Sequence, residues 1–439
     1  MAAALGVLVS CGSVKSGEEV VAASRDSKVV VAYVTSWSEV MPDPQYMTHI
    51  NYAFGHVNES FNGVKIDNEE RLRQIVDLRK QKPELKVLLS IGGWGSGRFS
   101  EMAANDEYRR AFAADCDRVV KEFALDGIDI DWEYPTSSMA NISSSPDDTE
   151  NFTLLMQDIR AAIGNEKELT LATVASARYI DFKAILPSVD FVNIMAYDMA
   201  SAPKHHSALY PSGHSGDITS DGAVTAHLKA GVPPSKLVMG MPFYGRGGDG
   251  YPSFQDYNKV GNTDTQYTEK WDEVAQVPYL ADKNDTLVFG FENPRSLAIK
   301  CQYILDKDLL GGMYWDYSGD NEQGDLRRTV AENLLGKPHK AKVLVLTERG
   351  GQHGGFTDAG LRWLAAEGVK GNFSITEINN ARNITEAYLS QFSLVIQLDF
   401  PPYTWPKEAE DAFVKYIEEG RGGWIGFHHA TLLGEFDGY

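Results

Sequence analysis

The chain has 439 residues, which is long for one domain and sufficient for two. Hydrophobic residues make up 43% of it and charged residues 23%, so a globular core is expected and disorder is excluded. The formal net charge of −20 repels phosphate backbones and argues against nucleic acid as a partner.

Residues 1–27 predict a signal and a tether rather than part of the fold. The apolar run MAAALGVLVS leads directly into Cys11, and Leu8-Val9-Ser10-Cys11 resembles a bacterial lipobox, although the usual positively charged region before it is missing. The resemblance implies a lipoprotein, secreted or held in the cell envelope, with possible membrane attachment through a lipid on Cys11. An ordinary apolar leader is the alternative. No other run reaches about 18 apolar residues, so no transmembrane helix is expected.

From residue 28 to residue 336, short apolar runs alternate with amphipathic stretches. Eight predicted strands fall at 29–37, 48–57, 85–94, 125–134, 169–176, 189–197, 237–245 and 310–318, and helical patterns fall at 68–81, 107–124, 148–164 and 294–307. This count predicts a (β/α)8 TIM barrel at 28–336. A doubly wound open sheet is the alternative, but no Gly-rich phosphate turn follows the first strand. The segment 247–292 is too long for a βα loop, and predicts a small insertion before strand eight that walls one side of a cleft.

The pattern restarts after a linker at 337–340. Apolar runs at 342–348, 394–399 and 422–430 alternate with helical patterns, which predicts an open, flavodoxin- or amidotransferase-like α/β domain at 341–439. It resembles the N-terminal part of a trehalose-utilisation-protein-like (ThuA-like) domain, so a partial domain is expected. The segment has no cysteine, and so lacks the thiol nucleophile of the amidotransferases that share this fold.

The cysteines and loop histidines do not predict a metal site. Cys116 and Cys301 lie in helical patterns without C-x-x-C spacing, and buried thiols are expected. His205, His206 and His214 follow the sixth strand in a polar loop, where exposed histidines are expected rather than ligands. We expect neither a metal nor another cofactor.

Three carboxylates alternate along the fourth predicted strand, within Asp126–Pro135 (DGIDIDWEYP). Because alternate side chains of a strand share a face, Asp129, Asp131 and Glu133 point into the barrel about 6–7 Å apart. Burying them together is costly, so stability does not explain them. Their mutual repulsion predicts a raised pKa for at least one of them. Glu133 lies nearest the C-terminal mouth, where barrel active sites lie, and is the natural proton donor.

This segment resembles the D-x-x-D-x-D-x-E signature of glycoside hydrolase family 18, the chitinase family. Four further matches follow in family order: Ser90-Ile91-Gly92-Gly93 resembles S-x-G-G, Met195-Ala196-Tyr197-Asp198 resembles M-x-Y-D, the run GMPFYGR at 240–246 resembles the seventh-strand segment, and Trp315 resembles the tryptophan that floors a subsite. Each motif alone is weak, but their order over residues 28–336 is specific.

The resemblance implies a retaining, substrate-assisted glycosidase that cleaves β-1,4 linkages of N-acetylglucosamine polymers such as chitin or chitooligosaccharides. In this mechanism the substrate's 2-acetamido oxygen attacks the anomeric carbon while Glu133 protonates the leaving oxygen, and Glu133 then activates water. Asp131 would hold the acetamido N–H, Tyr197 would donate to the acetamido group, and Asp129 would share charge or a proton with Asp131.

The remaining expected site residues are substrate contacts. Trp315 would stack on the apolar face of a sugar. The others are Asp198, Met195, Tyr33, Phe54, Tyr134, Tyr244, Arg246 and Ser90.

Other functions stay open. An endo-β-N-acetylglucosaminidase acting on N-glycans would use the same Glu133 chemistry, and peptidoglycan is a third possible substrate. A non-catalytic chitooligosaccharide-binding protein on the same barrel typically lacks the acid, whereas Glu133, Asp131 and Tyr197 are all present. The Trp-Glu-Tyr-Pro ending and Trp315 favour the chitinase interpretation.

Overall fold

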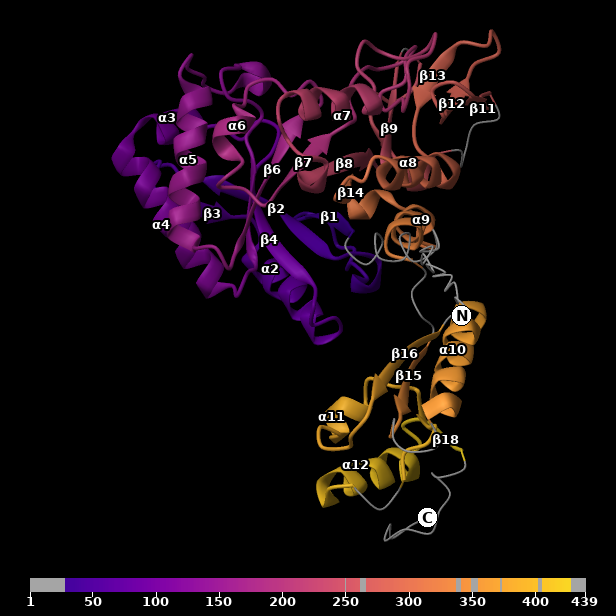
Figure 1. The fold of residues 1–439 in the computed structure, drawn as a ribbon. Helices are drawn as coiled ribbons and strands as arrows, with labels where there is room; N and C mark the ends of the chain where they lie inside the picture. The colour runs from indigo at the N-terminus through magenta and orange to yellow at the C-terminus, as the bar shows by residue number, and fades with distance from the viewer. Residues whose placement is uncertain are drawn as a thin grey trace, which may run out of the picture. The chain divides into compact units, whose positions relative to one another are not determined.

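The computed structural model describes residues 28–248, 250–260, 266–336, 341–348, 354–371, 373–401 and 405–427. The predicted signal and Cys11 therefore lie outside the described residues. Contacts divide the chain into two units, Met1–Gly336 and Lys337–Tyr439. Figure 1 shows them in indigo to orange and in orange to yellow.

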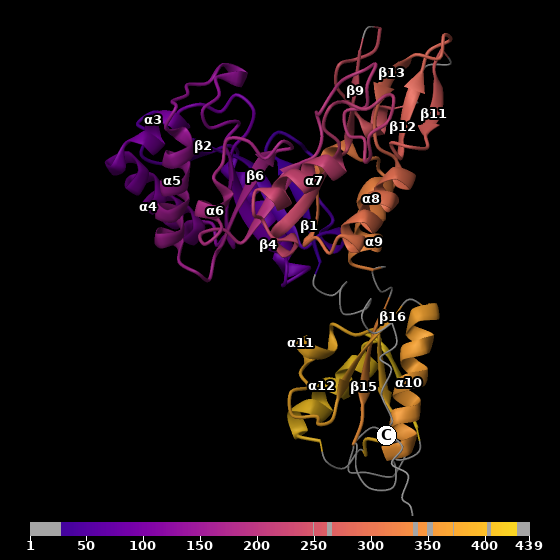
Figure 2. The ribbon, with the colours of Figure 1, turned by 45° about the horizontal axis from the view of Figure 1, so that its top comes forward.

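The first unit contains a closed barrel of eight parallel strands (Figures 1 and 2). In order around the barrel these are β1 (Val29–Thr35), β2 (His49–Val57), β4 (Lys86–Gly92), β5 (Gly127–Asp131), β6 (Glu168–Val174), β7 (Phe191–Met195), β8 (Leu237–Pro242) and β14 (Gly311–Trp315). Strand β14 pairs with β1 and closes the ring. The predicted (β/α)8 barrel is confirmed. Strand β3 (Val64–Ile66) adds an antiparallel hairpin to β2.

Helices surround this ring on the outside (Figure 2). They are α2 (Glu69–Val76), α3 (Phe99–Ala104), α4 (Asp106–Glu122), α5 (Asp148–Ile163), α6 (Phe182–Ile185), α7 (Ser220–Lys229), α8 (Pro294–Asp306) and α9 (Asp325–Leu334). Local sequence sets their starts. The Asn105 side chain accepts from the first backbone N–H groups of α4, and Asn293 forms a capping box with Ser296 before α8.

The apolar face of β5 packs against the helices, as the alternation predicts. Ile128, Ile130 and Trp132 belong to one buried cluster with Phe152 of α5, and the Trp132 and Phe152 rings lie 5.9 Å apart, edge to face. Burying this face stabilises the strand by about 25 cal/mol per Å² of apolar surface, while the alternate residues turn inward. Cys116 and Cys301 are buried, as expected.

The predicted insertion is a five-stranded antiparallel sheet between β8 and β14. Its strands are β9 (Tyr244–Gly247), β10 (Gln255–Asp256), β11 (Thr268–Asp272), β12 (Val277–Ala281) and β13 (Leu287–Gly290), in the order β10-β9-β13-β12-β11. It begins two residues after β8, so the barrel strand continues almost directly into the insertion.

The second unit is an open sheet of four parallel strands in the order β16-β15-β17-β18. The strands are β15 (Ala341–Leu346), β16 (Phe373–Ile378), β17 (Leu394–Gln397) and β18 (Gly423–Gly426), joined by α10 (Gly354–Gly371), α11 (Glu386–Leu389) and α12 (Lys407–Glu418). Helix α10 packs on one face, and α11 and α12 pack on the other. Across the described parts of both units, no helix has the length and apolarity to cross a membrane.

Candidate active site

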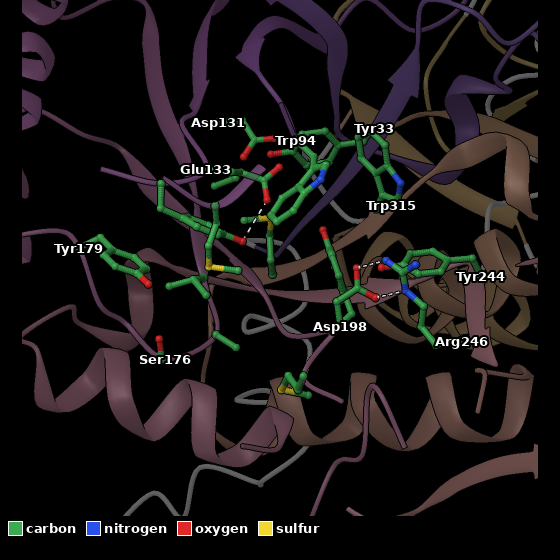
Figure 3. Close-up of a pocket in the computed structure, with 18 of the residues that line it drawn as sticks. Tyr33, Trp94, Asp131, Glu133, Ser176, Tyr179, Asp198, Tyr244, Arg246 and Trp315 are labelled. Carbon is green, nitrogen blue, oxygen red and sulfur yellow. Dashed lines mark hydrogen bonds and ion pairs between the residues drawn. The ribbon is translucent and has the colours of Figure 1, made fainter. Parts of the chain in front are cut away.

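A cavity of about 720 Å³ opens at the C-terminal mouth of the barrel. Asp131, the last residue of β5, and Glu133, two residues beyond it, line the cavity together (Figure 3). Barrel enzymes carry their chemistry at this end. The strand is shorter than the predicted 125–134, so Glu133 stands in the loop above the barrel rather than within its wall.

Asp129 is fully buried one layer deeper and is held by donors from four other strands. Its Oδ2 accepts from the Tyr33 hydroxyl at 2.9 Å and from the Ser90 hydroxyl at 2.8 Å. Its Oδ1 accepts from the Thr170 hydroxyl at 2.6 Å and from the Asn193 amide at 3.3 Å. Burial raises the pKa of Asp129, and these donors oppose that rise because each of them stabilises the ionised form.

Asp131 has no such support. Its carboxyl is buried, and its Oδ1 has no hydrogen-bond partner among the described residues. Burial, followed by the charges of Glu133 and Asp129, raises the pKa of Asp131 well above its ordinary value. The two aspartates of this strand therefore differ. Hydrogen-bond donors stabilise the ionised form of Asp129, whereas no donor contacts Oδ1 of Asp131 among the described residues.

The pKa of Glu133 is raised to about 7, mainly by burial and also by the charge of Asp198. A hydrogen bond from the Tyr134 hydroxyl to Oε2, at 3.0 Å, acts in the opposite direction. A carboxyl that titrates near neutral pH can both give and take a proton under physiological conditions. The predicted rise is confirmed for Glu133 and Asp131, but burial contributes more to it than the mutual repulsion on which the prediction was based.

Asp198 joins the barrel to the insertion. Arg246 of β9 donates two hydrogen bonds of 2.6 Å to its two carboxylate oxygens (Figure 3). The His206 Nδ1 lies 3.5 Å from Asp198 Oδ1. Burial would raise the pKa of Asp198, but the hydrogen bonds and charges of Arg246 and His206 outweigh it, and the pKa falls below the ordinary value. Asp198 is therefore a fixed anion beside Glu133.

Aromatic rings also line the cavity that holds Glu133. Trp315, the last residue of β14, stacks on Phe54 with ring centroids 5.6 Å apart and contacts Tyr33 at 5.7 Å. The Tyr197 ring meets Tyr244 edge to face at 6.0 Å. Flat apolar rings beside fixed polar groups suit a sugar, which has an apolar face and a polar edge.

The structure brings most of the predicted residues to the cavity. These are Asp131, Glu133, Tyr33, Phe54, Tyr134, Met195, Tyr197, Asp198, Tyr244, Arg246 and Trp315. Two predicted residues, Asp129 and Ser90, do not line it. Ser90 is fully buried and donates to Asp129, so the substrate contact expected of Ser90 is replaced by a contact with Asp129.

Several cavity residues were missed in the sequence. Trp37 and Trp94 follow β1 and β4, and their side chains are 64% and 62% exposed at the cavity edge. A tryptophan as the last residue of a predicted barrel strand is the signal that could have identified both. Arg178 and Tyr179 after β6 and Phe254 of the insertion also line the cavity, and no local pattern marks them.

A three-residue hydrogen-bond chain holds the loop that carries Trp94. The Ser96 hydroxyl lies 2.8 Å from His56 Nδ1, and His56 Nε2 lies 3.0 Å from the Asp67 carboxylate. The loop is also fixed at its start, because the backbone N–H of Gly93 donates to the Asp131 carbonyl at 2.8 Å. Trp94 is thus presented to the cavity from a loop fixed at both ends.

Of the three loop histidines, His214 is exposed, as expected, and the other two differ from the expectation. His205 and His206 are buried rather than exposed, because the insertion packs over their loop. His205 Nε2 lies 3.1 Å from Asp272 of β11, and the His205 ring contacts Tyr279 of β12. In the described part of the chain, no group of His, Cys, Asp and Glu side chains is arranged to hold a metal ion.

Comparison with known proteins decides the family. Residues 29–320 match the family described as Glycosyl hydrolases family 18. The chain belongs to this family. Its first unit is therefore a glycosidase barrel of the kind found in chitinases, as the resemblance implied. Residues 342–438 match the family described as Trehalose utilisation.

Individual relatives agree with this assignment. The chain is 30% identical to Chitinase A1 of Niallia circulans, over 69% of this chain and 58% of that one, so it spans little more than half of that relative. It is 31% identical to Chitotriosidase-1 of Mus musculus, over 67% and 74% of the two chains. Among solved structures, a family 18 N-acetylglucosaminidase from Paenibacillus barengoltzii matches with 32% identity and a TM-score of 0.65, over 70% of this chain and all of that one.

Proposed function

We propose that the barrel hydrolyses β-1,4 linkages that follow N-acetylglucosamine, in chitin or chitooligosaccharides, with Glu133 as acid and base. One observation carries the proposal: a carboxyl whose pKa is about 7 stands at the cavity mouth beside a second buried carboxyl, Asp131, whose pKa is also raised, and a fixed anion, Asp198. The names of the relatives support the substrate class, since they include chitinases, a chitotriosidase and a chitinase solved in complex with allosamidin.

The first step needs no protein nucleophile. The substrate's acetamido oxygen attacks C1, the bond from C1 to the leaving oxygen breaks, and Glu133 gives its proton to that oxygen. Asp131 accepts the acetamido N–H and stabilises the positive oxazolinium, and the Tyr197 hydroxyl donates to the acetamido oxygen. Burial keeps the pKa of the Tyr197 hydroxyl well above its ordinary value, so it remains a donor.

In the second step Glu133 takes a proton from water, the water oxygen attacks C1 from the side that the leaving group vacated, and the bond from C1 to the acetamido oxygen breaks, which restores the acetamido group. The configuration at C1 is therefore retained. Asp129 lies behind Asp131, is held by its four donors, and shares charge or a proton with Asp131. Trp315 supports the retained sugar from below, and Asp198 stays ionised beside the reacting centre.

The test is hydrolysis of fluorogenic N,N′-diacetylchitobioside and chitotriose substrates by the wild type and by Glu133→Gln. Loss of the proton donor lowers turnover by about 10²–10⁴-fold. Glu133→Gln keeps the size of the side chain, so substrate binding should persist. If the wild type is inert on these substrates but trims a high-mannose glycoprotein, the endo-β-N-acetylglucosaminidase function replaces this one. If it binds chitooligosaccharides and cleaves neither substrate, it is a lectin.

We also propose that the protein is a secreted or cell-envelope lipoprotein anchored through Cys11. The lipobox-like run Leu8-Val9-Ser10-Cys11 supports this. Metabolic labelling with a radioactive or alkyne fatty acid in a bacterial host should mark the wild type and not Cys11→Ala. Equal labelling of both proteins contradicts the proposal.

A further inference from the structure

The loop after β6 presents one cation to the cavity. It runs from Ala175 to Ile180, and two of its residues, Ala177 and Tyr179, have left-handed backbones with φ of 56° and 75°. Such conformations cost on the order of 1 kcal/mol or more each for residues other than glycine. They persist here because the loop is held: the Thr149 hydroxyl donates to the Tyr179 carbonyl at 2.9 Å.

The Tyr179 ring fixes the same loop to the catalytic carboxyl. It stacks on Tyr134 with centroids 5.4 Å apart and planes 13° apart, and Tyr134 is the donor to Glu133. Arg178 lies between the two left-handed residues, and its side chain lines the cavity that Glu133 lines. Its Nε donates to the Ser176 hydroxyl at 3.1 Å, which orients the guanidinium.

Within the described part of the chain, the guanidinium of Arg178 has no carboxylate partner. The other cation of the cavity, Arg246, is paired with both oxygens of Asp198, whereas no ion pair involves Arg178. A guanidinium has five N–H donors and Ser176 takes one, so both terminal nitrogens remain available. They match the two oxygens of a carboxylate.

The cavity is less acidic than the chain. Arg246 neutralises Asp198, and burial raises the pKa of both Asp131 and Glu133, the latter to about 7. Surface charges that contribute to the net charge of −20 are largely screened where they lie farther from the cavity than a Debye length, about 8 Å at physiological ionic strength.

The position of the loop tells which sugar would meet Arg178. Tyr179 and Ser176 lie on the opposite side of Glu133 from Trp315 (Figure 3). Strand β6 is likewise separated from β14 by two strands on one side of the ring and four on the other. If Trp315 supports the retained N-acetylglucosamine, Arg178 faces the sugar that leaves.

We propose that Arg178 forms a subsite for a carboxylate on the leaving sugar. The proposal rests on the glycosidase function above and extends it beyond chitin: the preferred bond joins a retained N-acetylglucosamine to an acidic sugar, in place of a second N-acetylglucosamine. The acetamido group needed for attack is on the retained residue, so an acidic leaving residue is compatible with the same chemistry. A lactyl ether, as in N-acetylmuramic acid, or a uronic acid would supply the carboxylate.

The experiment compares kcat/KM on three tetrasaccharides: chitotetraose, an alternating N-acetylglucosamine and N-acetylmuramic acid chain, and that chain with its carboxylates amidated. A fourth, with glucuronic acid as the leaving residue, distinguishes the two sources of carboxylate. We expect the wild type to prefer the free acid to its amide by about 10-fold or more, the size of a charge-assisted contact. Arg178→Ala should bring that ratio near one, Arg178→Lys should keep part of it, and Arg178→Glu should invert it.

Arg110→Ala is the matched control, because this exposed arginine lies on the outer helix α4 and should leave the ratio unchanged. A wild type that cleaves acid and amide equally, or a ratio that Arg178→Ala does not change, overturns the proposal. A different result would contradict the glycosidase function itself: the wild type would then cleave none of the substrates, chitotetraose included.

Discussion

The hydrogen bond from Tyr134 to Glu133 should set the alkaline limit of activity. The tyrosine hydroxyl lies 3.0 Å from Glu133 Oε2 and stabilises the ionised carboxylate, so it lowers the pKa of Glu133 against the rise caused by burial. A general acid works only while protonated, and activity should fall as pH rises through a pKa of about 7. Tyr134→Phe removes the donor and keeps the ring, so the pKa of Glu133 should rise and the alkaline limb should move upward.

The size of this effect follows from the strength of the bond. A hydrogen bond to a charged group contributes about 1.5–3 kcal/mol, and one pKa unit corresponds to about 1.36 kcal/mol, which sets a ceiling of about one to two pH units. Water in the open cavity will replace part of the lost bond. We therefore expect the alkaline limb to rise by about one unit.

The assay is the pH dependence of kcat/KM on a fluorogenic chitobioside, which reports the free enzyme. Tyr179→Phe is the control, since it changes a hydroxyl on the ring stacked against Tyr134 without touching Glu133. An alkaline limb that stays in place or moves down in Tyr134→Phe would refute both the assignment of Glu133 as the acid and the direction of the hydrogen bond's effect.

Three further changes test other parts of the structure. Ser96→Ala removes one hydrogen bond that holds the Trp94 loop. It should raise KM for chitotetraose several-fold, with little change in KM for a short fluorogenic substrate. Equal effects on the two substrates would contradict a role of Trp94 in binding the longer sugar. Asp129→Asn replaces an acceptor that four donors surround, and should lower kcat by at least about 10-fold with a lowered thermal midpoint; unchanged kcat would show that the buried charge is dispensable. Glu292→Gln breaks an ion pair with Lys300 in which both side chains are fully buried, and should cost about 3–5 kcal/mol in chemical denaturation, whereas a cost below about 1 kcal/mol would argue that the pair is not ionised.

The barrel was predictable because its strands show both which residues face the helices and which face the interior. In β5 the apolar residues Ile128 and Ile130, with Trp132 directly after the strand, mark the face that meets the helices, and the carboxylates between them mark the interior. The chain order of strands and helices then allows few topologies. The insertion was located by its length, but its sheet was not, because its strands are short and pair within a segment that has no barrel-like alternation.

The site was predictable where a motif lies at a strand end and unpredictable where contacts are long-range. Glu133, Tyr197 and Trp315 are marked by their own neighbours in the sequence. His206 is buried by an insertion that lies later in the sequence. The composition of the loop that contains His206 is polar, and therefore predicts exposure. Ser90 was assigned to the substrate because nothing local shows that Asp129, 39 residues away, takes its hydroxyl.

The four donors around Asp129 have a consequence for how the barrel is aligned. A slip of β5 by two residues would keep its apolar side chains toward the helices, so hydrophobic packing alone discriminates poorly against it. It would, however, place Asp131 opposite Ser90 and Thr170, which now sit directly beside Asp129 on the neighbouring strands, and would push Glu133 into the wall. The hydroxyls and the carboxylate therefore help to fix the register of β5 against its neighbours. A redesign that removes these polar residues from the active site would also remove part of what determines the strand pairing of the barrel.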